Sequence, residues 1–445
     1  MKRRYFGTDG VRAPYGSATM NEEFAWRLGA AAAAWLRETN ATPGARILIG
    51  RDTRHSGASL AQALAGGLSH GGYEPVALDI LPTPAVARAV TTRGAALGIV
   101  VTASHNPASD NGIKFFGPDG VKLSDEMEGR IEELLPERRV PDGNRPLQRL
   151  DARPDYLAGI AGQIHVNLTG WKIVLDMAHG ATVDTSGPAL RACGAEVVAI
   201  GAAPDGSNIN AGVGSEHPEK MCAAVRASGA KLGIAHDGDG DRCILCDEQG
   251  NVLDGDEILT ILALHALRQG KLAKNILVVT VQSNLGVEAA VGAAGGRVLR
   301  TAVGDRYVIE RMRAEGATLG GESSGHVICA EVSPTGDGLV AALKVIEVML
   351  ATGQPLSVLR RGLRKFPQKS VALKVREKLP LESLARLPRE IRALESELGT
   401  QGRVLVRYSG TEPKLRLLVE GPTDESVDAG IARLEAAAKA ELQVF

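Results

Sequence analysis

Short apolar runs rich in Val, Ile and Leu alternate with amphipathic stretches through most of the chain. Near the start, the runs at 47–49, 76–80 and 97–101 predict strands, and helices are expected from Ser56 and after Pro84. Strands that are separated by helices in this way form largely parallel sheets buried on both faces. The opening segment therefore predicts an α/β domain.

The same alternation restarts twice further along the chain. The predicted strands and helices lie at 171–176, 188–193, 196–200, 219–228 and 232–235, and then at 276–281, 287–293, 298–301 and 307–314. After Ser370 the order changes to a strand, a helix at 389–398, two strands at 404–407 and 415–420, and a helix from Asp424. The pattern predicts three similar α/β domains with mixed, mostly parallel sheets, followed by a smaller α+β domain.

The length of the chain agrees with several domains. A chain of 445 residues exceeds what one hydrophobic core organises, and about 100–200 residues per domain predicts three or four units. A segment rich in Pro, Gly, Arg and Asp at 136–154 marks the clearest boundary, and weaker ones lie near Asp254 and Pro367. We therefore expect domains at 1–154, 155–254, 255–367 and 368–445.

Composition narrows the class of partner. Lys and Arg number 51 against 52 Asp and Glu, and aromatic residues make up only 3%. The chain therefore has neither the positive field nor the stacking platforms that favour nucleic acid. It has five cysteines, no apolar leader after Met1, and near its start no apolar run approaching the ~20 residues of a membrane span. We expect a soluble cytoplasmic protein without a membrane partner.

Ser104 is the first candidate for chemistry. The sequence Val-Val-Thr-Ala-Ser-His-Asn-Pro at 100–107 places it just past an apolar strand, where open α/β sheets gather their ligands. This location suits a nucleophile or a phosphate carrier. A turn serine, with Asn106 and Pro107 ending the strand, is the alternative. No Gly-x-Ser-x-Gly surrounds Ser104, which argues against acyl transfer of the hydrolase kind.

Three carboxylates follow another apolar strand, in the sequence Asp-Gly-Asp-Gly-Asp at 237–241. In an extended segment, the spacing of Asp237, Asp239 and Asp241 sends all three side chains to one side, and hard oxygen ligands suit Mg²⁺ or Ca²⁺. An EF-hand is the alternative, because Glu248 stands twelfth from Asp237. Its sixth position, however, is Arg242 instead of glycine, and strands are expected on both sides. We expect a catalytic Mg²⁺ site.

Two later loops carry groups that bind sugars and phosphates. The loop Gly-Gly-Glu-Ser-Ser-Gly-His at 320–326 combines a carboxylate, two hydroxyls and an imidazole, which match several sugar hydroxyls; a plain loop is the alternative. The segment 407–416 places two arginines, hydroxyls and a glycine between two strands, as in a phosphate cradle. A simple hairpin turn is the alternative there. Arg12 and Lys114 add cations near the start of the chain.

Taken in order, these segments resemble the α-D-phosphohexomutase superfamily, and within it the bacterial phosphoglucosamine mutases. The resemblance spans the whole chain and rests on five segments, at 4–12, 102–107, 237–242, 322–326 and 407–416. It implies four domains around a central cleft: the serine loop in the first, the metal loop in the second, the sugar loop in the third and the phosphate loop in the last.

The resemblance also implies roles for single residues. It makes Ser104 a phosphoserine whose phosphate, with Asp237, Asp239 and Asp241, binds one Mg²⁺ per chain. It implies that Glu322 and Ser324 bind the sugar hydroxyls. The non-reacting phosphate is then bound by Arg407, Ser409, Gly410, Thr411 and Arg416. Phosphorylation of Ser104 is then required for activity. For proton transfer we expect Lys114 and His326, with Arg12 as a cationic clamp.

The implied reaction interconverts glucosamine 6-phosphate and glucosamine 1-phosphate through a 1,6-bisphosphate, toward UDP-N-acetylglucosamine and the cell wall. The middle residue of the sugar loop is Ser323, where many phosphoglucosamine mutases have Gln and phosphomannomutase/phosphoglucomutase has Met. Phosphomannomutase/phosphoglucomutase therefore remains the alternative, and a Mg²⁺-dependent sugar phosphatase or a non-catalytic binding protein is a more remote one. The expected partner is a hexosamine phosphate, and the expected assembly is a monomer or a homodimer.

Overall fold

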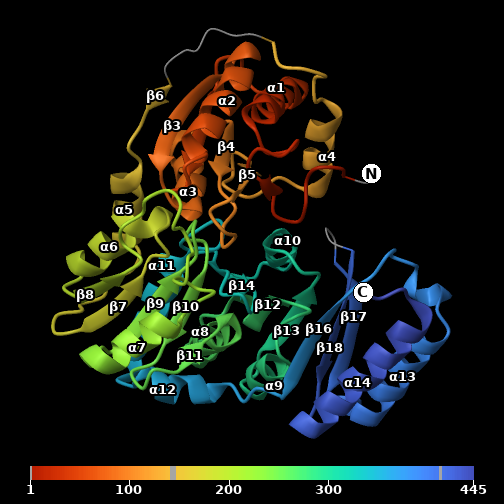
Figure 1. The fold of residues 1–445 in the computed structure, drawn as a ribbon. Coiled ribbons are helices and arrows are strands. Elements are labelled where there is room, and N and C mark those ends of the chain that lie inside the picture. Colours follow the sequence, from red (N-terminus) through yellow and green to blue (C-terminus); the bar gives the residue numbers. More distant parts are fainter. Residues whose placement is uncertain (1–2, 141–146, 410–412) are drawn as a thin grey trace. The chain divides into compact units, whose positions relative to one another are not determined.

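The computed structural model describes residues 3–140, 147–409 and 413–445. Their contacts divide into two compact units, of which the first comprises 1–282 with 294–362 and the second 283–293 with 363–445. In the described part of the chain the strands form four sheets, coloured along the sequence in Figure 1. Three sheets belong to the first unit and one to the second.

The first sheet has the strand order β1 (Val11–Pro14), β5 (Asp110–Phe116), β4 (Leu97–Val101), β2 (Arg46–Arg51), β3 (Glu74–Ile80), β6 (Gln148–Arg149). Its helices are α1 (Glu22–Glu38), α2 (Gly57–His70), α3 (Thr83–Arg93) and α4 (Asp125–Glu133). The strands β4, β2, β3 and β6 are parallel, whereas β5 is antiparallel to both β4 and β1. The sheet is therefore mixed, as predicted.

The second sheet has the order β11 (Val252–Leu253), β10 (Cys243–Cys246), β9 (Leu232–His236), β7 (Lys172–Asp176), β8 (Glu196–Ile200). It is accompanied by α5 (Arg153–Ala161), α6 (Ser186–Ala192) and α7 (Glu219–Ser228). The third has the order β13 (Arg297–Thr301), β12 (Ile276–Thr280), β14 (Leu319–Gly321), β15 (Val327–Cys329). Its helices within the first unit are α8 (Gly255–Arg268), α10 (Asp305–Glu315), α11 (Gly338–Thr352) and α12 (Leu356–Leu359).

These three sheets share one arrangement that positions the candidate loops. A buried strand pairs in parallel with one neighbour and, through the next loop, antiparallel with the following strand: β4 with β2 and β5, β9 with β7 and β10, β14 with β12 and β15. The serine, metal and sugar loops are the connections that follow β4, β9 and β14. The three α/β segments therefore present their functional loops from equivalent places.

The second unit contains α9 (Leu285–Ala293) and a sheet in the order β16 (Gln368–Lys374), β18 (Lys414–Glu420), β17 (Arg403–Tyr408). Both strand pairs are antiparallel. The helices α13 (Arg386–Leu398) and α14 (Asp424–Glu441) lie side by side against this sheet (Figure 1). Leucines and valines such as Leu387, Leu417, Val419 and Leu434 fill the core between them. This α+β order is the one predicted after Ser370.

Among the described helices, none is by itself both long and apolar enough to cross a membrane. The pair formed by α11 and the segment Leu356–Gly362 satisfies the criteria of length and composition together, but it is bent by 92°. Most of α11 is buried inside the first unit, including Leu339, Val340, Val345 and Ile346. Its apolar side chains thus belong to the protein core.

Candidate functional site

Ser104 has a backbone conformation that is uncommon for a residue with a side chain. Its φ of 52° lies in the left-handed region, and only 1% of the residue is exposed. The hydroxyl that caps the turn belongs to Thr102 and not to Ser104. Thr102 Oγ1 accepts a hydrogen bond from the Ser104 N–H at 2.9 Å. The hydroxyl of Ser104 instead donates to Asp237 Oδ2 at 2.5 Å. The serine is therefore directed at the metal loop.

The three carboxylates of the metal loop converge. Asp237, Asp239 and Asp241 offer ligand atoms within 4.8 Å of one another, and all three residues are buried. The reason differs from the one expected, because β9 ends at His236 and the loop is a turn, with Gly240 at a φ of 74°. An extended segment does not bring the carboxylates together here; a glycine-bent turn does.

The donor set fits a hard divalent cation. In the described part of the chain, Asp239 Oδ1 and Asp241 Oδ1 are buried and have no hydrogen-bond partner. Buried carboxylate oxygens without partners are costly unless a cation coordinates them. The EF-hand alternative is wrong, because strands flank the loop and Glu248 instead accepts hydrogen bonds from Ser357.

The electrostatics of the triad are strongly perturbed. Burial, together with the neighbouring Asp239 and Asp241, raises the pKa of Asp237 well above its usual range. Burial also acts to raise the pKa of Asp241, but Lys114 and His326 outweigh it and hold that pKa well below the usual range. Lys114 and His326 therefore offset part of the negative charge that the buried triad carries.

Two predicted cations reach this loop from neighbouring strands. Lys114, on β5, places Nζ 2.9 Å from Asp239 Oδ2, 3.2 Å from Asp9 Oδ2 and 3.6 Å from Asp241 Oδ2. Arg12, on β1, forms an ion pair with Asp9. Its buried Nε has no hydrogen-bond partner among the groups that the structure describes, so this atom remains available to an anion.

His326 joins the sugar loop to the metal loop. A β-bridge pairs it with Arg242, and its Nδ1 lies 3.6 Å from Asp241 Oδ2. Its Nε2 lies 3.6 Å from Asp305 Oδ2. Burial acts to lower the pKa of His326, but the carboxylates of Asp241 and Asp305 raise it above the usual value. The imidazole is thus held between two carboxylates.

The other sugar-loop residues lie in the same hairpin. Glu322 N–H donates to the carbonyl of His326 at 2.9 Å, and the Glu322 carboxylate accepts from Gly304 N–H at 3.0 Å. Ser324 Oγ is buried and, within the described residues, has no hydrogen-bond partner. The first unit therefore brings together Ser104, the Asp triad, Lys114, Arg12, His326 and this loop.

Several residues at the site escaped the sequence reasoning. Lys122, buried between β5 and α4, is paired with Asp9 and with Asp305 Oδ2, the latter at 2.7 Å. Thr83, at the start of α3, donates through Oγ1 to Asp239 Oδ2 at 2.7 Å. Asp9 lies in a segment noted for its likeness to the family but carried no expected role. Lys122 and Thr83 have no local signal, because each acts through partners distant in sequence.

The phosphate loop belongs to the second unit. Arg407 on β17 stands opposite Arg416 on β18 in the antiparallel register, and burial together with Arg416 lowers the pKa of Arg407. Ser409 is buried, and its N–H donates to the carbonyl of Lys414 at 2.8 Å. Gly410 and Thr411 lie outside the described residues. Two adjacent guanidinium groups favour an anionic ligand.

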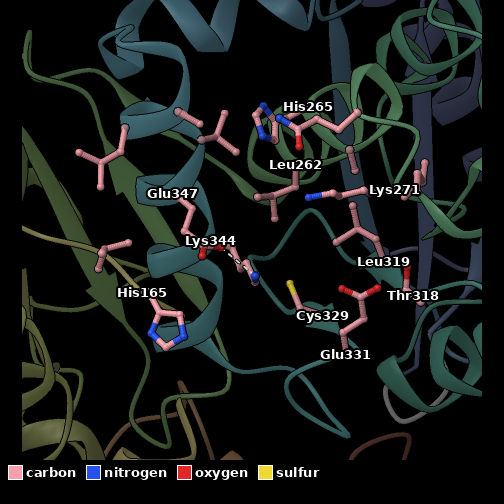
Figure 2. A pocket seen from close by; sticks show the side chains of 17 residues that line it. His165, Leu262, His265, Lys271, Thr318, Leu319, Cys329, Glu331, Lys344 and Glu347 are labelled. Carbon is pink, nitrogen blue, oxygen red and sulfur yellow. Dashed lines mark ion pairs between the residues drawn. The ribbon is translucent and has the colours of Figure 1, made fainter. Parts of the chain in front are cut away.

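A separate cavity of about 630 Å³ lies in the first unit (Figure 2). Lys344 and Glu347, on α11, line it and form an ion pair at 2.7 Å. Leu319 and Cys329 are paired across β14 and β15 at the end of the hairpin away from the sugar loop. Burial raises the pKa of Cys329 to about 12, so its thiol is not a nucleophile near neutral pH. No predicted site residue lines this cavity.

Models of one family match the chain in four consecutive parts. They describe phosphoglucomutase/phosphomannomutase: alpha/beta/alpha domain I at 3–140, domain II at 154–250, domain III at 254–366 and the C-terminal domain at 371–437. With the sheets described above, they confirm the predicted fold class.

Individual proteins agree with these models. A phosphoglucosamine mutase of Syntrophotalea carbinolica is 44% identical over 443 residues, covering 97% of this chain and 96% of the relative. A phosphoglucomutase/phosphomannomutase family protein of Burkholderia thailandensis has a similar structure, with a TM-score of 0.81, 25% identity and 97% of each chain covered. The N-acetylphosphoglucosamine mutase of Aspergillus fumigatus, solved with GlcNAc-6P and magnesium, shares the fold at a TM-score of 0.62, 16% identity, and 98% and 96% coverage. The chain therefore belongs to the phosphoglucomutase/phosphomannomutase family and, within it, to the phosphoglucosamine mutases.

Proposed function

We propose that this isomerase interconverts glucosamine 6-phosphate and glucosamine 1-phosphate through a phosphorylated Ser104 and a 1,6-bisphosphate. The observation that carries the proposal is the short hydrogen bond from Ser104 to Asp237, within a buried triad in which Asp239 Oδ1 and Asp241 Oδ1 have no hydrogen-bond partner among the described residues. The five cysteines are all unpaired, which supports our further proposal that the enzyme works in a reducing cytoplasm.

Asp237, Asp239 and Asp241 would hold one Mg²⁺ together with the phosphate on Ser104. When bound, the cation neutralises charge on the phosphoryl group in transfer. The magnesium in the Aspergillus fumigatus relative supports this assignment. Thr83 and Lys114 each contact Asp239 Oδ2 and so fix the orientation of that carboxylate.

In the proposed reaction, the bond between Ser104 Oγ and phosphorus breaks while a bond from a sugar hydroxyl oxygen to phosphorus forms. The sugar hydroxyl loses its proton to a base, and the serine oxygen later recovers one from an acid. We propose Lys114 and His326 for these transfers, because Lys114 lies beside Asp239 and His326 beside Asp241. Both carboxylates belong to the same triad as Asp237, which Ser104 contacts. The reverse transfer, from the other end of the bisphosphate, restores the phosphoserine.

We propose substrate-binding roles for residues of the sugar loop and of the phosphate loop. Glu322 and Ser324 would bind sugar hydroxyls, and Arg407, Ser409, Gly410, Thr411 and Arg416 the non-reacting phosphate. The unpaired Ser324 Oγ and the facing arginines on β17 and β18 support these roles. Arg12 would act as the cationic clamp on the reacting phosphate.

The decisive experiment compares kcat/KM for glucosamine 6-phosphate, glucose 1-phosphate and mannose 1-phosphate with Mg²⁺ present. The proposal expects the amino sugar to be preferred, and a preference for either neutral hexose would refute it in favour of phosphomannomutase/phosphoglucomutase. Steady release of inorganic phosphate without isomer would identify a phosphatase.

The carrier role of Ser104 is tested separately. Intact-mass analysis with peptide mapping should find phosphate on Ser104, and Ser104→Ala should abolish isomer formation with an unchanged circular-dichroism spectrum. The matched control is Ser109→Ala, an exposed serine in the same segment, which should retain activity. Substantial turnover by the Ser104 variant would exclude a phosphoserine intermediate.

A further inference from the structure

The left-handed backbone of Ser104 is held by contacts that no predicted role explains. A non-glycine residue at a φ of 52° persists only where its surroundings fix it. The carbonyl oxygen of Ser104 has two donors, Arg54 Nη2 at 3.1 Å and Asn210 Nδ2 at 2.8 Å. Arg54 lies between β2 and α2, and Asn210 lies between β8 and α7, so they connect the serine loop to two parts of the fold.

Arg54 holds the serine loop through hydrogen bonds to its backbone carbonyls. Its guanidinium is fully buried, and it donates to the carbonyls of Ser104, Asn106, Pro107 and Asp110. Its Nε donates to Asp52 Oδ2 at 2.9 Å, so every N–H of the guanidinium has an acceptor. Asp52 Oδ2 also accepts from Thr102 Oγ1 at 2.7 Å, and Thr102 in turn accepts from Ser104 N–H. Both backbone groups of Ser104 are therefore fixed.

Asn210 reaches the same loop from the segment between β8 and α7, and β8 belongs to the sheet that carries the metal loop. Its Nδ2 donates to the carbonyls of Ser104 and Asn106, at 2.8 and 3.0 Å. Carbonyl oxygens only accept, so the amide nitrogen must face them. Gly238 of the metal loop packs on the same oxygen, since a Cβ there would lie 2.5 Å from it.

We propose that Asn210 and Arg54 are positioning residues. They fix where the phosphate on Ser104 lies relative to the metal loop. Arg54 fixes the serine loop on its own sheet, and Asn210 ties that loop to the sheet of Asp237, Asp239 and Asp241. Without the Asn210 amide, the carbonyl of Ser104 loses its hydrogen bond to the domain of the metal loop, and Oγ moves relative to Asp237. The inference rests on the proposed phosphoserine reaction.

The test is Asn210→Gly, because Asn210 itself has a φ of 60° and glycine keeps that conformation without strain. With Ser104 phosphorylated beforehand, kcat for glucosamine 6-phosphate should fall on the order of 100-fold while KM stays unchanged. The Mg²⁺-induced shift of the phosphoserine signal in phosphorus NMR should shrink. The control, Asn208→Ala, removes a half-buried amide of the same segment, which bonds to Ala203 and Asp205 within that segment, and should behave as wild type.

A purely structural role predicts a lower melting temperature with kcat per folded molecule and the NMR shift unchanged, and that result would overturn the inference. Arg54→Lys is the second variant, since one ammonium cannot donate to four carbonyls. It should reproduce the loss of kcat at unchanged KM. A wild-type kcat in a folded Arg54→Lys protein would contradict the role of Arg54. If the wild-type protein itself forms no isomer, the proposed function fails instead, so the two failures are distinguishable.

Discussion

Ser104 Oγ lies 2.5 Å from Asp237 Oδ2, although 133 residues separate them in the chain. The serine follows β4 of the first sheet and the aspartate follows β9 of the second, at equivalent places in two similar domains. Burial and the two other carboxylates raise the pKa of Asp237 well above its usual range. A cation at this position would relieve that repulsion and would bring the phosphate on Ser104 into its coordination.

Asp237→Asn should therefore weaken the binding of Mg²⁺ more than it disturbs the fold. The amide keeps the shape and a hydrogen bond to Ser104 but removes one negative charge. The Mg²⁺ concentration for half-maximal activity should rise on the order of 100-fold. Asp184→Asn, which changes a carboxylate with 57% of its side chain exposed, serves as the control. An unchanged Mg²⁺ titration would exclude Asp237 as a ligand.

The close approach of the two loops makes Gly238→Ala informative. A Cβ at Gly238 would lie 2.5 Å from the Ser104 carbonyl oxygen and 2.8 Å from Ile209 Cδ1. Because the first neighbour is backbone, the serine loop must shift, and we expect kcat to fall by at least about tenfold. Gly292→Ala, which meets nothing within 4 Å, should leave kcat unchanged. Equal kcat values for the two variants would show that the loops accommodate the methyl group.

Asp337 gives a prediction for pH. Burial raises its pKa to about 6 in the fold, whereas an unfolded Asp titrates near 3.9. The folded state then binds the extra proton between these values, so the stabilisation is complete below about pH 4 and is lost as pH rises through about 6.

Asp337→Asn removes this titration while retaining an acceptor for Tyr156 and Val340. From pH 4.5 to 7 the stability of the variant relative to wild type should increase by most of about 3 kcal/mol. Thermal melts of both proteins across this range provide the measurement. A constant difference would mean that Asp337 is already ionised at pH 4.5.

The buried ion pair between α4 and α10 should matter for stability. Arg306, with 2% of its side chain exposed, lies 2.7 Å from Glu128, with 1% exposed. Arg306→Met leaves Glu128 with Arg3 and should cost about 3 kcal/mol. Adding Glu128→Gln to this variant should recover part of the loss, and strict additivity of the two changes would contradict the coupling. Arg311→Met, at an exposed pair with Glu315, should cost under about 1 kcal/mol.

The phosphate-binding role that we propose for the second unit predicts a change in substrate affinity. Arg407→Met removes one of two facing guanidinium groups and should raise KM for glucosamine 6-phosphate about tenfold or more. Arg389→Met, on the exposed surface of α13, is the matched charge control and should leave KM unchanged. A Michaelis constant that does not respond to the loss of Arg407 would remove it from the phosphate site.

The residue pattern by itself determined much of this protein. Apolar runs of strand length, separated by amphipathic helices, suffice for three α/β segments and a different final one, because alternation of buried and exposed positions is a local property. The serine and metal loops were also visible, since Ser104 and Asp237–Asp241 each follow an apolar run predicted to be a strand, whereas the loop 320–326 was visible from its composition. Reactive side chains that follow a predicted strand can therefore be recognised without the tertiary structure.

The tertiary structure decided which of these groups meet and how. The convergence of the Asp triad comes from a turn at Gly240 and not from the extended spacing inferred from the sequence. Lys122, Asp305, Arg54 and Asn210 carry no local signal, because a buried cation or amide acquires its role only from partners that folding brings to it. The strained φ of Ser104 is likewise a property of its surroundings: its own sequence places it in a loop, and the contacts from two sheets direct its hydroxyl to Asp237.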